Sequence, residues 1–189
     1  MEGKERKTRL PEYKKDFGNT EAEEMGIQFA EEMFNFVKRV EKASEYDDKV
    51  NHIDYIYFTK EGPFVAVQQK LTESEERIMD AIEVILKQPL VQLHDNQGKI
   101  ISKEKLPLVL IRDKLEVWGE AYNRYLKERL DTPIAALKDK LGTKMKLLEQ
   151  MLACLKTERY YFPLHQEILD PRIVVVESEL SETKKQLAN

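Results

Sequence analysis

The sequence predicts an α/β protein whose core runs helix, β-hairpin, helix and strand, with a helical extension after it. Two segments with helical spacing of apolar residues, near 20–45 and 74–88, flank a stretch rich in β-branched and aromatic residues. A later run, LPLVLIR at 106–112, has the continuous apolar composition of a strand that is buried on both faces. From residue 113 onward the patterns are almost wholly helical, so we expect the α/β core to end at residue 112.

Length and composition fit one buried core with an appendage. The chain has 189 residues, of which 41% are hydrophobic and 35% charged, which favours a globular, helix-rich protein over a disordered one. No window of 18 uncharged apolar residues is present, and the N-terminal stretch has no apolar signal region. We therefore expect a cytoplasmic protein without a membrane span. The formal net charge of −4 argues against a protein that coats nucleic acid through bulk electrostatics.

Cysteine and histidine are too sparse for a disulfide scaffold or a zinc site. The single cysteine, Cys154, cannot form an intramolecular disulfide, and His52, His94 and His165 are not spaced like zinc ligands. We interpret Cys154 as a small buried hydrophobe rather than a reactive thiol.

The N-terminal region combines a basic arm with the first helix. Six lysine and arginine residues fall within the first 15 positions, so we expect residues 1–19 to be a flexible, solubilising arm, with phosphate contact as the alternative. Thr20 and Glu23 then form a capping box that predicts the start of a helix. Apolar residues recur at helical spacing from Ile27 to Val40, so this helix should pack through one broad face.

The centre of the chain predicts a β-hairpin with a polar end. The strands are expected at VNHIDYIYFTK, residues 50–60, and FVAVQQKL, residues 64–71, with the turn between them. Because side chains alternate along a strand, Gln68 and Lys70 project from the same face. If the pairing puts Asp54 on that face, the three side chains converge at the end of the hairpin far from its turn.

The elements after the hairpin complete the predicted organisation. Thr72 and Glu75 form a second capping box, which predicts a helix directly after the polar strand end, and PLVQLHDNQGKII predicts a short strand and a turn. Helices at 113–130 and 132–161, the second with Thr132 as its cap, should pack as an αα-hairpin, followed by a brief β-like stretch at RIVVVE. The expected parts are a basic arm at 1–19, an α/β core at 20–112, a helical hairpin extension at 113–165, and a C-terminal segment and tail at 166–189.

The polar strand end has the chemistry of a magnesium site. The carboxylate of Asp54 and the amide oxygen of Gln68 are hard oxygen ligands, and a backbone carbonyl, waters and a substrate phosphate would complete the shell that magnesium prefers. Lys70 would orient the attacking water or stabilise charge on the phosphate. Such a constellation hydrolyses phosphodiesters. The alternative is a solvated strand end in which Asp54 pairs with His52 or with a lysine.

The stretch DDKVNHIDYIYFTKEGPFVAVQQKLT resembles the core of the PD-(D/E)xK restriction-endonuclease-like superfamily. It is most similar to the Mrr-type branch, whose motif is an aspartate, a hairpin and then Gln-x-Lys. The resemblance covers about residues 20–112, and the sequence departs from the family pattern in having KVNHID in place of a glycine-rich approach and a glutamine at the usual acidic position. It implies that Asp54 and Gln68 bind Mg²⁺ or Mn²⁺ and that Lys70 is catalytic.

The resemblance also implies an assisting glutamate and a function. We favour Glu31 of the first helix for this role, with Glu32 and Glu23 as alternatives. The implied function is Mg²⁺-dependent hydrolysis of phosphodiester bonds in DNA, with RNA as a second substrate and the C-terminal helices as a homodimer interface or substrate clamp. One alternative is a non-catalytic member of the same fold that binds nucleic acid or a protein, and another is a helical adaptor in which the hairpin is only structural.

Three further features have two interpretations each. The aromatic stripe of Trp118, Tyr122 and Tyr125 predicts a packed helix face, with base stacking as the alternative. The lysine-rich stretch KDKLGTKMK, residues 138–146, predicts a solvated helix face, with phosphate contact as the alternative. His52, expected on the face of Asp54, predicts a simple hydrogen bond, with proton transfer as the alternative.

Overall fold

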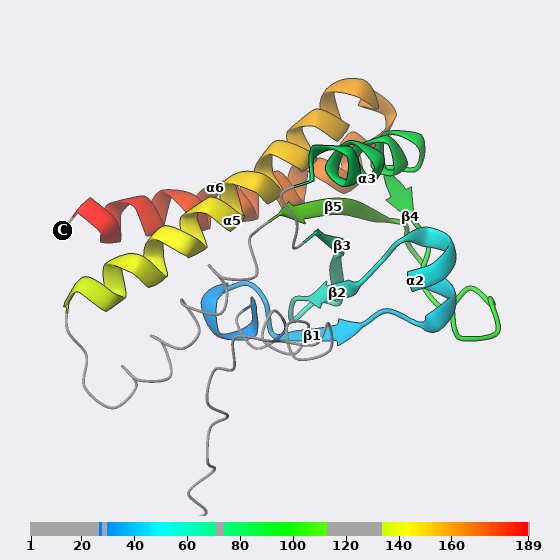
Figure 1. Ribbon diagram of the computed structural model, residues 1–189, viewed down its shortest axis with the longest axis horizontal. Helices are drawn as coiled ribbons and strands as arrows, with labels where there is room; N and C mark the ends of the chain where they lie inside the picture. Colours follow the sequence, from blue (N-terminus) through cyan, green and yellow to red (C-terminus); the bar gives the residue numbers. More distant parts are fainter. Residues whose placement is uncertain (1–26, 28–29, 71–73, 113–133, 189) are drawn as a thin grey trace, which may run out of the picture.

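The computed structural model describes residues 27, 30–70, 74–112 and 134–188, and it shows an α/β fold on a mixed five-stranded sheet of order β1-β2-β3-β5-β4 (Figure 1). Helical residues at 30–33 precede the sheet. The strands are β1 (Arg39–Lys42), β2 (Tyr55–Phe58), β3 (Pro63–Lys70), β4 (Leu90–Val91) and β5 (Leu106–Arg112). The helices are α2 (Glu45–Asn51), α3 (Glu75–Lys87), α5 (Ile134–Tyr161) and α6 (Gln166–Ala188), with a short 3₁₀ turn at Pro163–His165.

The hairpin and the apolar strand predicted from the sequence are confirmed. β1, β2 and β3 pair antiparallel in chain order, whereas β5 lies parallel to β3 and is reached through α3 and β4. β4 lies antiparallel to β5 at the far edge of the sheet. Every residue of β5 except Arg112 is buried, as its continuous apolar composition predicts.

Helices cover both faces of the sheet. Successive residues of a strand enter opposite cores, because side chains alternate across a sheet. The α3-side core joins sheet and α3 residues, among them Ile56, Ala66, Leu108, Leu110, Ile78, Ala81 and Ile85. The α5–α6-side core joins sheet and C-terminal helix residues, among them Val65, Val67, Val109, Leu147, Met151, Leu169 and Val176.

Helix α5 also covers the outer edge of β5. The Gln150 amide donates from Nε2 to the carbonyl oxygen of Arg112 (2.8 Å), and its Oε1 accepts from the N–H of Arg112 (2.7 Å). The Cys154 thiol donates to the carbonyl oxygen of Leu110, with Sγ and the oxygen 3.7 Å apart. An open strand edge is a template for pairing with another chain, so these contacts remove a site of aggregation.

The first helix is shorter than the sequence predicts. A turn follows the helical residues at 35–36, and residues 39–42, expected at the end of the helix, form strand β1. Glu179 of α6 holds the turn, because its carboxylate accepts from the backbone N–H groups of Asn35 (2.7 Å) and Phe36 (3.3 Å). This contact links positions far apart in the sequence. The helical spacing of apolar residues continues past the turn, so the sequence pattern does not show where the helix ends.

The first strand of the hairpin also begins later than predicted, at Tyr55. Residues 45–51 form helix α2 instead, and Ser44 is its N-cap, with a side-chain oxygen that accepts from the N–H of Asp47 (3.0 Å). The Ser-x-x-Asp spacing at 44–47 is a capping signal that outweighs the β-propensity of Val50.

Helix α3 is present, but its predicted cap is wrong. The N-cap is Ser74, whose hydroxyl accepts from the N–H of Arg77 (3.5 Å), two residues after the expected Thr72. Thr72 itself lies outside the described residues, as do Thr20 and Glu23 of the other predicted capping box.

The C-terminal segment is helical, so the predicted β-like stretch at RIVVVE is wrong. Helix α6 includes it and packs side by side with α5 (Figure 1). Burial of Val176 and Leu180 against α5 outweighs the lower helix propensity of β-branched residues. The described partner of α5 is thus α6, and the expected partner at 113–130 lies outside the described residues. In the part of the chain that the structure describes, no helix is long and apolar enough to cross a membrane.

Candidate functional site

The β2–β3 hairpin brings Asp54 next to the end of β3 that carries Gln68 and Lys70. The register of β2 and β3 runs as far as the pair of Tyr55 and Val67, and the N–H of Asp54, just before it, donates to the carbonyl oxygen of Val67. Lys70 follows Gln68 by two residues, so these two side chains share one face of β3. Gln68 pairs along the sheet with Leu110 of β5, which belongs to the α3-side core. Gln68 and Lys70 therefore lie on the α3 side of the sheet, at the end of the hairpin far from its turn, and Asp54 contacts this end through the N–H of Gln69.

Contacts with both neighbouring strands fix the position of Asp54. Its N–H donates to the carbonyl oxygen of Val67 (2.8 Å), and its own carbonyl oxygen accepts from the N–H of Ala43 (3.0 Å). The carboxylate Oδ2 accepts from the N–H of Gln69 at 2.5 Å. Charge-assisted hydrogen bonds of this kind are the stronger ones, so the half-buried carboxylate has a defined orientation.

Gln68 contains a buried polar atom without a partner. The residue is 3% exposed, and its Oε1 accepts no hydrogen bond from the described residues. Leaving a buried acceptor unsatisfied costs on the order of 1–3 kcal/mol, and such atoms are uncommon in native proteins. An amide oxygen is a hard ligand, so a cation beside Asp54 would satisfy it. The residues present fit a magnesium or manganese ion in this respect.

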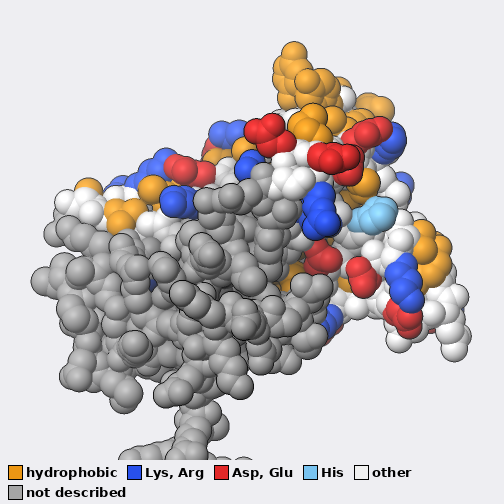
Figure 2. Space-filling view, in the orientation of Figure 1, with side chains coloured by type: hydrophobic (Ala, Val, Ile, Leu, Met, Phe, Trp, Pro, Cys, Tyr) orange, Lys and Arg blue, Asp and Glu red, His pale blue; other side chains and the backbone are white. Residues whose placement is uncertain are grey.

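Lys70 is the last residue of β3 and is half-buried. Figure 2 shows acidic and basic side chains and a histidine close together on one face of the molecule. In the same orientation, Figure 1 places this region between α3 and α2. A lysine at a strand end beside a carboxylate can contact a water or a phosphate oxygen.

Glu31, the first-helix glutamate favoured from the sequence, contacts the backbone of β1. Met33 packs that helix into the α5–α6-side core. The Oε1 atom of Glu31 accepts from the N–H of Val40 on β1 (2.7 Å). Glu32 is exposed, and Glu23 lies outside the described residues. The carboxylate of Glu31 thus satisfies a strand edge rather than the candidate site.

His52 lies outside the strand to which the alternation assigned it. It closes α2 in the left-handed conformation (φ 57°) and is exposed. The direction of the His52 side chain is therefore set by the end of α2, and the strand alternation that predicted a shared face with Asp54 does not apply to it.

Other predicted features have mixed outcomes. Burial raises the pKa of the Cys154 thiol to about 11, which supports its interpretation as a buried hydrophobe. The prediction that the lysine-rich stretch 138–146 forms a solvated helix face is wrong at Lys144. This residue is 5% exposed, and its Nζ lies 2.6 Å from Oε1 of Glu179. The aromatic stripe of Trp118, Tyr122 and Tyr125 lies outside the described residues.

Sequence reasoning missed three buried acidic residues, Asp47, Glu158 and the Glu179 described above. Asp47 is 1% exposed and hydrogen-bonds to Asn51 and His94, and its only signal in the sequence is the spacing from Ser44. Glu158 is also 1% exposed, neither of its carboxyl oxygens has a partner among the described residues, and burial raises its pKa to about 9. No local pattern distinguishes Glu158 from the solvated glutamates of a helix.

A cation at the hairpin end would take few ligands from the protein. No group of three or more His, Cys, Asp or Glu side chains within the described residues could hold a metal ion. Asp54 and Gln68 would supply one carboxylate and one amide oxygen, and waters and substrate oxygens would complete the shell, as magnesium commonly requires. This donor set carries a single negative charge, which favours weak binding that a phosphate substrate strengthens.

Comparison with models of protein families, with curated proteins and with solved structures found no match for this chain. Function is therefore inferred from the side chains at the hairpin end.

Proposed function

We propose that this chain is a metal-dependent deoxyribonuclease with a restriction-endonuclease-like core. The order of elements supports the proposal, since helical residues, an antiparallel hairpin, a helix and a parallel strand follow one another between residues 30 and 112. The observation that carries it is the buried amide oxygen of Gln68, which accepts no hydrogen bond from the described residues, while the N–H of the next residue, Gln69, donates to the Asp54 carboxylate. Mg²⁺ or Mn²⁺ is the cofactor that fits these donors.

In this mechanism Asp54 and Gln68 would hold the ion, which when bound would supply Lewis-acid activation of the phosphate. The N–H of Gln69 keeps the Asp54 carboxylate in one orientation. Lys70, on the same face, holds the attacking water and offsets negative charge that develops on the phosphate oxygens.

Cleavage assays test this function directly. The purified chain is incubated with supercoiled plasmid, single-stranded DNA and RNA, each with Mg²⁺, Mn²⁺ or EDTA. We expect cleavage of DNA with metal only. Asp54→Ala and Lys70→Ala should lower the rate by roughly 10²-fold or more, because each removes a group that acts on the reacting phosphate or its ligand.

Two control variants remove side chains of the same types at a distance from the site. Asp48→Ala removes an exposed carboxylate of α2, and Lys60→Ala removes an exposed ammonium at the hairpin turn. Both should cleave at the parent rate. The deoxyribonuclease proposal is wrong if the folded parent cleaves no substrate under any metal condition.

A non-catalytic nucleic-acid-binding protein is the second candidate function. The engagement of Glu31 by the backbone of Val40 favours it, because that contact occupies the carboxylate that the resemblance assigns to the catalytic site. DNA binding that weakens steeply with salt, without cleavage, would support this candidate. A homodimer through the C-terminal helices stays a prediction, which light scattering of the purified chain tests.

A further inference from the structure

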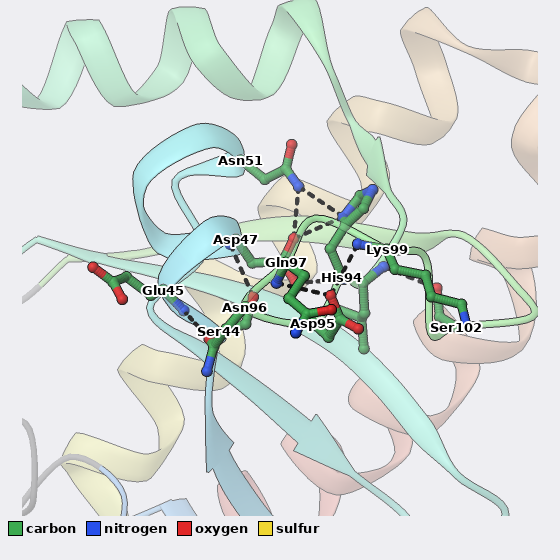
Figure 3. Close-up of polar contacts among 11 residues, drawn as sticks. Ser44, Glu45, Asp47, Asn51, His94, Asp95, Asn96, Gln97, Lys99 and Ser102 are labelled. Carbon is green, nitrogen blue, oxygen red and sulfur yellow. Dashed lines mark hydrogen bonds and ion pairs between the residues drawn. The ribbon is translucent and has the colours of Figure 1, made fainter.

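A buried polar network lies outside the candidate site, between α2 and the segment that follows β4 (Figure 3). The Oδ1 atom of Asp47 accepts from Nδ2 of Asn51 (2.7 Å) and lies 2.9 Å from Nδ1 of His94. Its Oδ2 atom accepts from the backbone N–H of His94 (2.7 Å). Asp47 is 1% exposed, so both oxygens of a buried carboxylate are satisfied by one neighbouring segment and its own helix.

The contacts define the tautomer of His94. A carboxylate only accepts hydrogen bonds, so the proton of the neutral ring belongs on Nδ1, facing Asp47. Nδ1 of His94 and Nδ2 of Asn51, which are 3.2 Å apart, are then both donors aimed at the same oxygen. The imidazole is thus a donor that fixes Asp47.

Packing reinforces the network at the start of α2. The ring of Tyr46 lies 4.9 Å from the ring of His94 and rests on Gly98, where a Cβ atom would come within 2.9 Å of it. The backbone N–H of Glu45 donates to Oδ1 of Asn96 (2.9 Å). The segment 94–98 therefore clamps the first turn of α2.

The far end of α2 leads directly to the candidate site. The carbonyl oxygen of Asp47 accepts from the N–H groups of His52 and Ile53, the second at 3.1 Å. His52 has the left-handed conformation, which costs a non-glycine residue energy and persists only where surrounding contacts impose it. Ile53 is fully buried in the α3-side core, and Asp54 comes next. The Asp47 side chain thus stabilises α2, and its backbone carbonyl fixes His52 and Ile53, the two residues that precede Asp54.

We infer that Asp47 and His94 are positioning residues for the Asp54 carboxylate, so that the segment 94–98 sets the metal affinity of the site at the hairpin end. The effect on metal affinity rests on the proposed function, but the positioning of Asp54 can be measured without metal. Partners that orient a ligand commonly change metal affinity or activity 10–100-fold when removed.

The variants separate the lost contact from general destabilisation. His94→Ala removes the donor to Asp47, whereas His94→Asn places an amide N–H near the position of Nδ1 and should restore the contact. Glu179→Gln weakens the buried ion pair with Lys144 on the other face of the sheet and serves as the matched control.

The first measurement is hydrogen exchange of the Gln69 amide in metal-free protein, because that N–H donates to Asp54. We expect exchange on the order of tenfold faster in His94→Ala, near the parent rate in His94→Asn, and unchanged in Glu179→Gln. The second is Mn²⁺ affinity by calorimetry, expected to fall by about tenfold in His94→Ala alone.

The outcomes distinguish the inference from the proposed function. Parent-like Gln69 exchange in His94→Ala overturns the positioning role, whatever the metal result. Faster exchange with no Mn²⁺ binding by the parent supports the positioning role and counts against the nuclease.

Discussion

At the scale of single residues, the side chains that distinguish this molecule are buried polar groups that lack partners. Gln68 and Glu158 are both nearly inaccessible to solvent, and three of their side-chain oxygens accept no hydrogen bond within the described residues. Their chemistry separates them: an amide oxygen can only be satisfied by a donor or a cation, whereas a carboxyl group can take up a proton. Gln68 and Glu158 therefore lead to different predictions.

Gln68→Glu tests whether the hairpin end holds a cation. Without metal we expect the variant to be less stable than the parent by roughly 1–3 kcal/mol, because a carboxylate replaces a neutral amide in a buried position. With Mn²⁺ it should gain more in melting temperature than the parent, since two carboxylates then face the ion. Gln69→Glu is the control, because that side chain lies on the opposite face of β3. Equal responses of both variants to Mn²⁺ would exclude a cation beside Gln68.

Glu158 predicts a stability that falls with rising pH. Folding raises its pKa from the ordinary value of 4.5 to about 9, so between these values the folded chain keeps a proton that the unfolded chain releases. The contribution is fully present below pH 4.5 and is lost as the pH rises toward 9. Glu158→Gln removes this dependence: parent and variant should melt alike near pH 5, and the variant should be more stable at pH 8, by on the order of 2–4 kcal/mol. A difference independent of pH would refute a buried, protonated Glu158.

At the scale of elements, a few long-range contacts hold the helices against the sheet. The buried pair of Lys144 and Glu179 joins α5 to α6 and also caps the turn before β1. Tyr46 seated on Gly98 joins α2 to the turn that follows β4. Both contacts connect segments that are far apart in the chain, and both predict large effects from small changes.

Glu179→Ala should destabilise the chain by about 3–5 kcal/mol, because it leaves the Lys144 ammonium buried without its carboxylate. The turn at 35–36 loses its acceptor at the same time. Glu177→Ala is the matched control, since the pair of Lys156 and Glu177 is about half exposed and should contribute less than about 1 kcal/mol. Urea unfolding of the two variants measures the contrast, and similar losses would show that burial of the pair contributes little.

Two glycine substitutions should have opposite signs. Gly98→Ala forces a side chain into φ +77° and within 2.9 Å of the Tyr46 ring, so we expect a loss of roughly 1–3 kcal/mol. Gly142→Ala, in helix α5 with open space around the added methyl group, should gain about 0.5–1 kcal/mol. Thermal unfolding of both variants provides the comparison, and a stabilised Gly98→Ala would contradict the described turn.

At the scale of the whole molecule, α5 and α6 complete the fold rather than extend it. They supply the helix side of one core and cover the outer edge of β5 through Gln150 and Cys154. A chain that ends at Arg112 therefore exposes a large apolar face and an open strand edge. We expect it to aggregate, as size-exclusion chromatography will show. A monomeric truncated chain with the far-ultraviolet spectrum of a folded α/β protein would contradict this dependence.

The sequence by itself determined the hairpin, the apolar strand β5, helix α3 and the common face of Gln68 and Lys70. Each follows from a local rule, namely alternation in strands, helical spacing or continuous apolar composition, and such rules act between residues close in the chain. The short Ser-x-x-Asp cap of α2 was also available in the sequence, although the β-branched pattern after it obscured the helix.

Only the tertiary structure decided where the first helix ends, that RIVVVE is helical, and that Glu31 contacts the backbone of β1. In each case a contact from a distant segment competes with the local preference and wins. Burial against α5 contributes more free energy than helix propensity, which differs by less than about 1 kcal/mol per residue. The burial of Gln68 and the clamp on Asp47 belong to the same class, because they exist only once the α3-side core and the segment 94–98 have assembled.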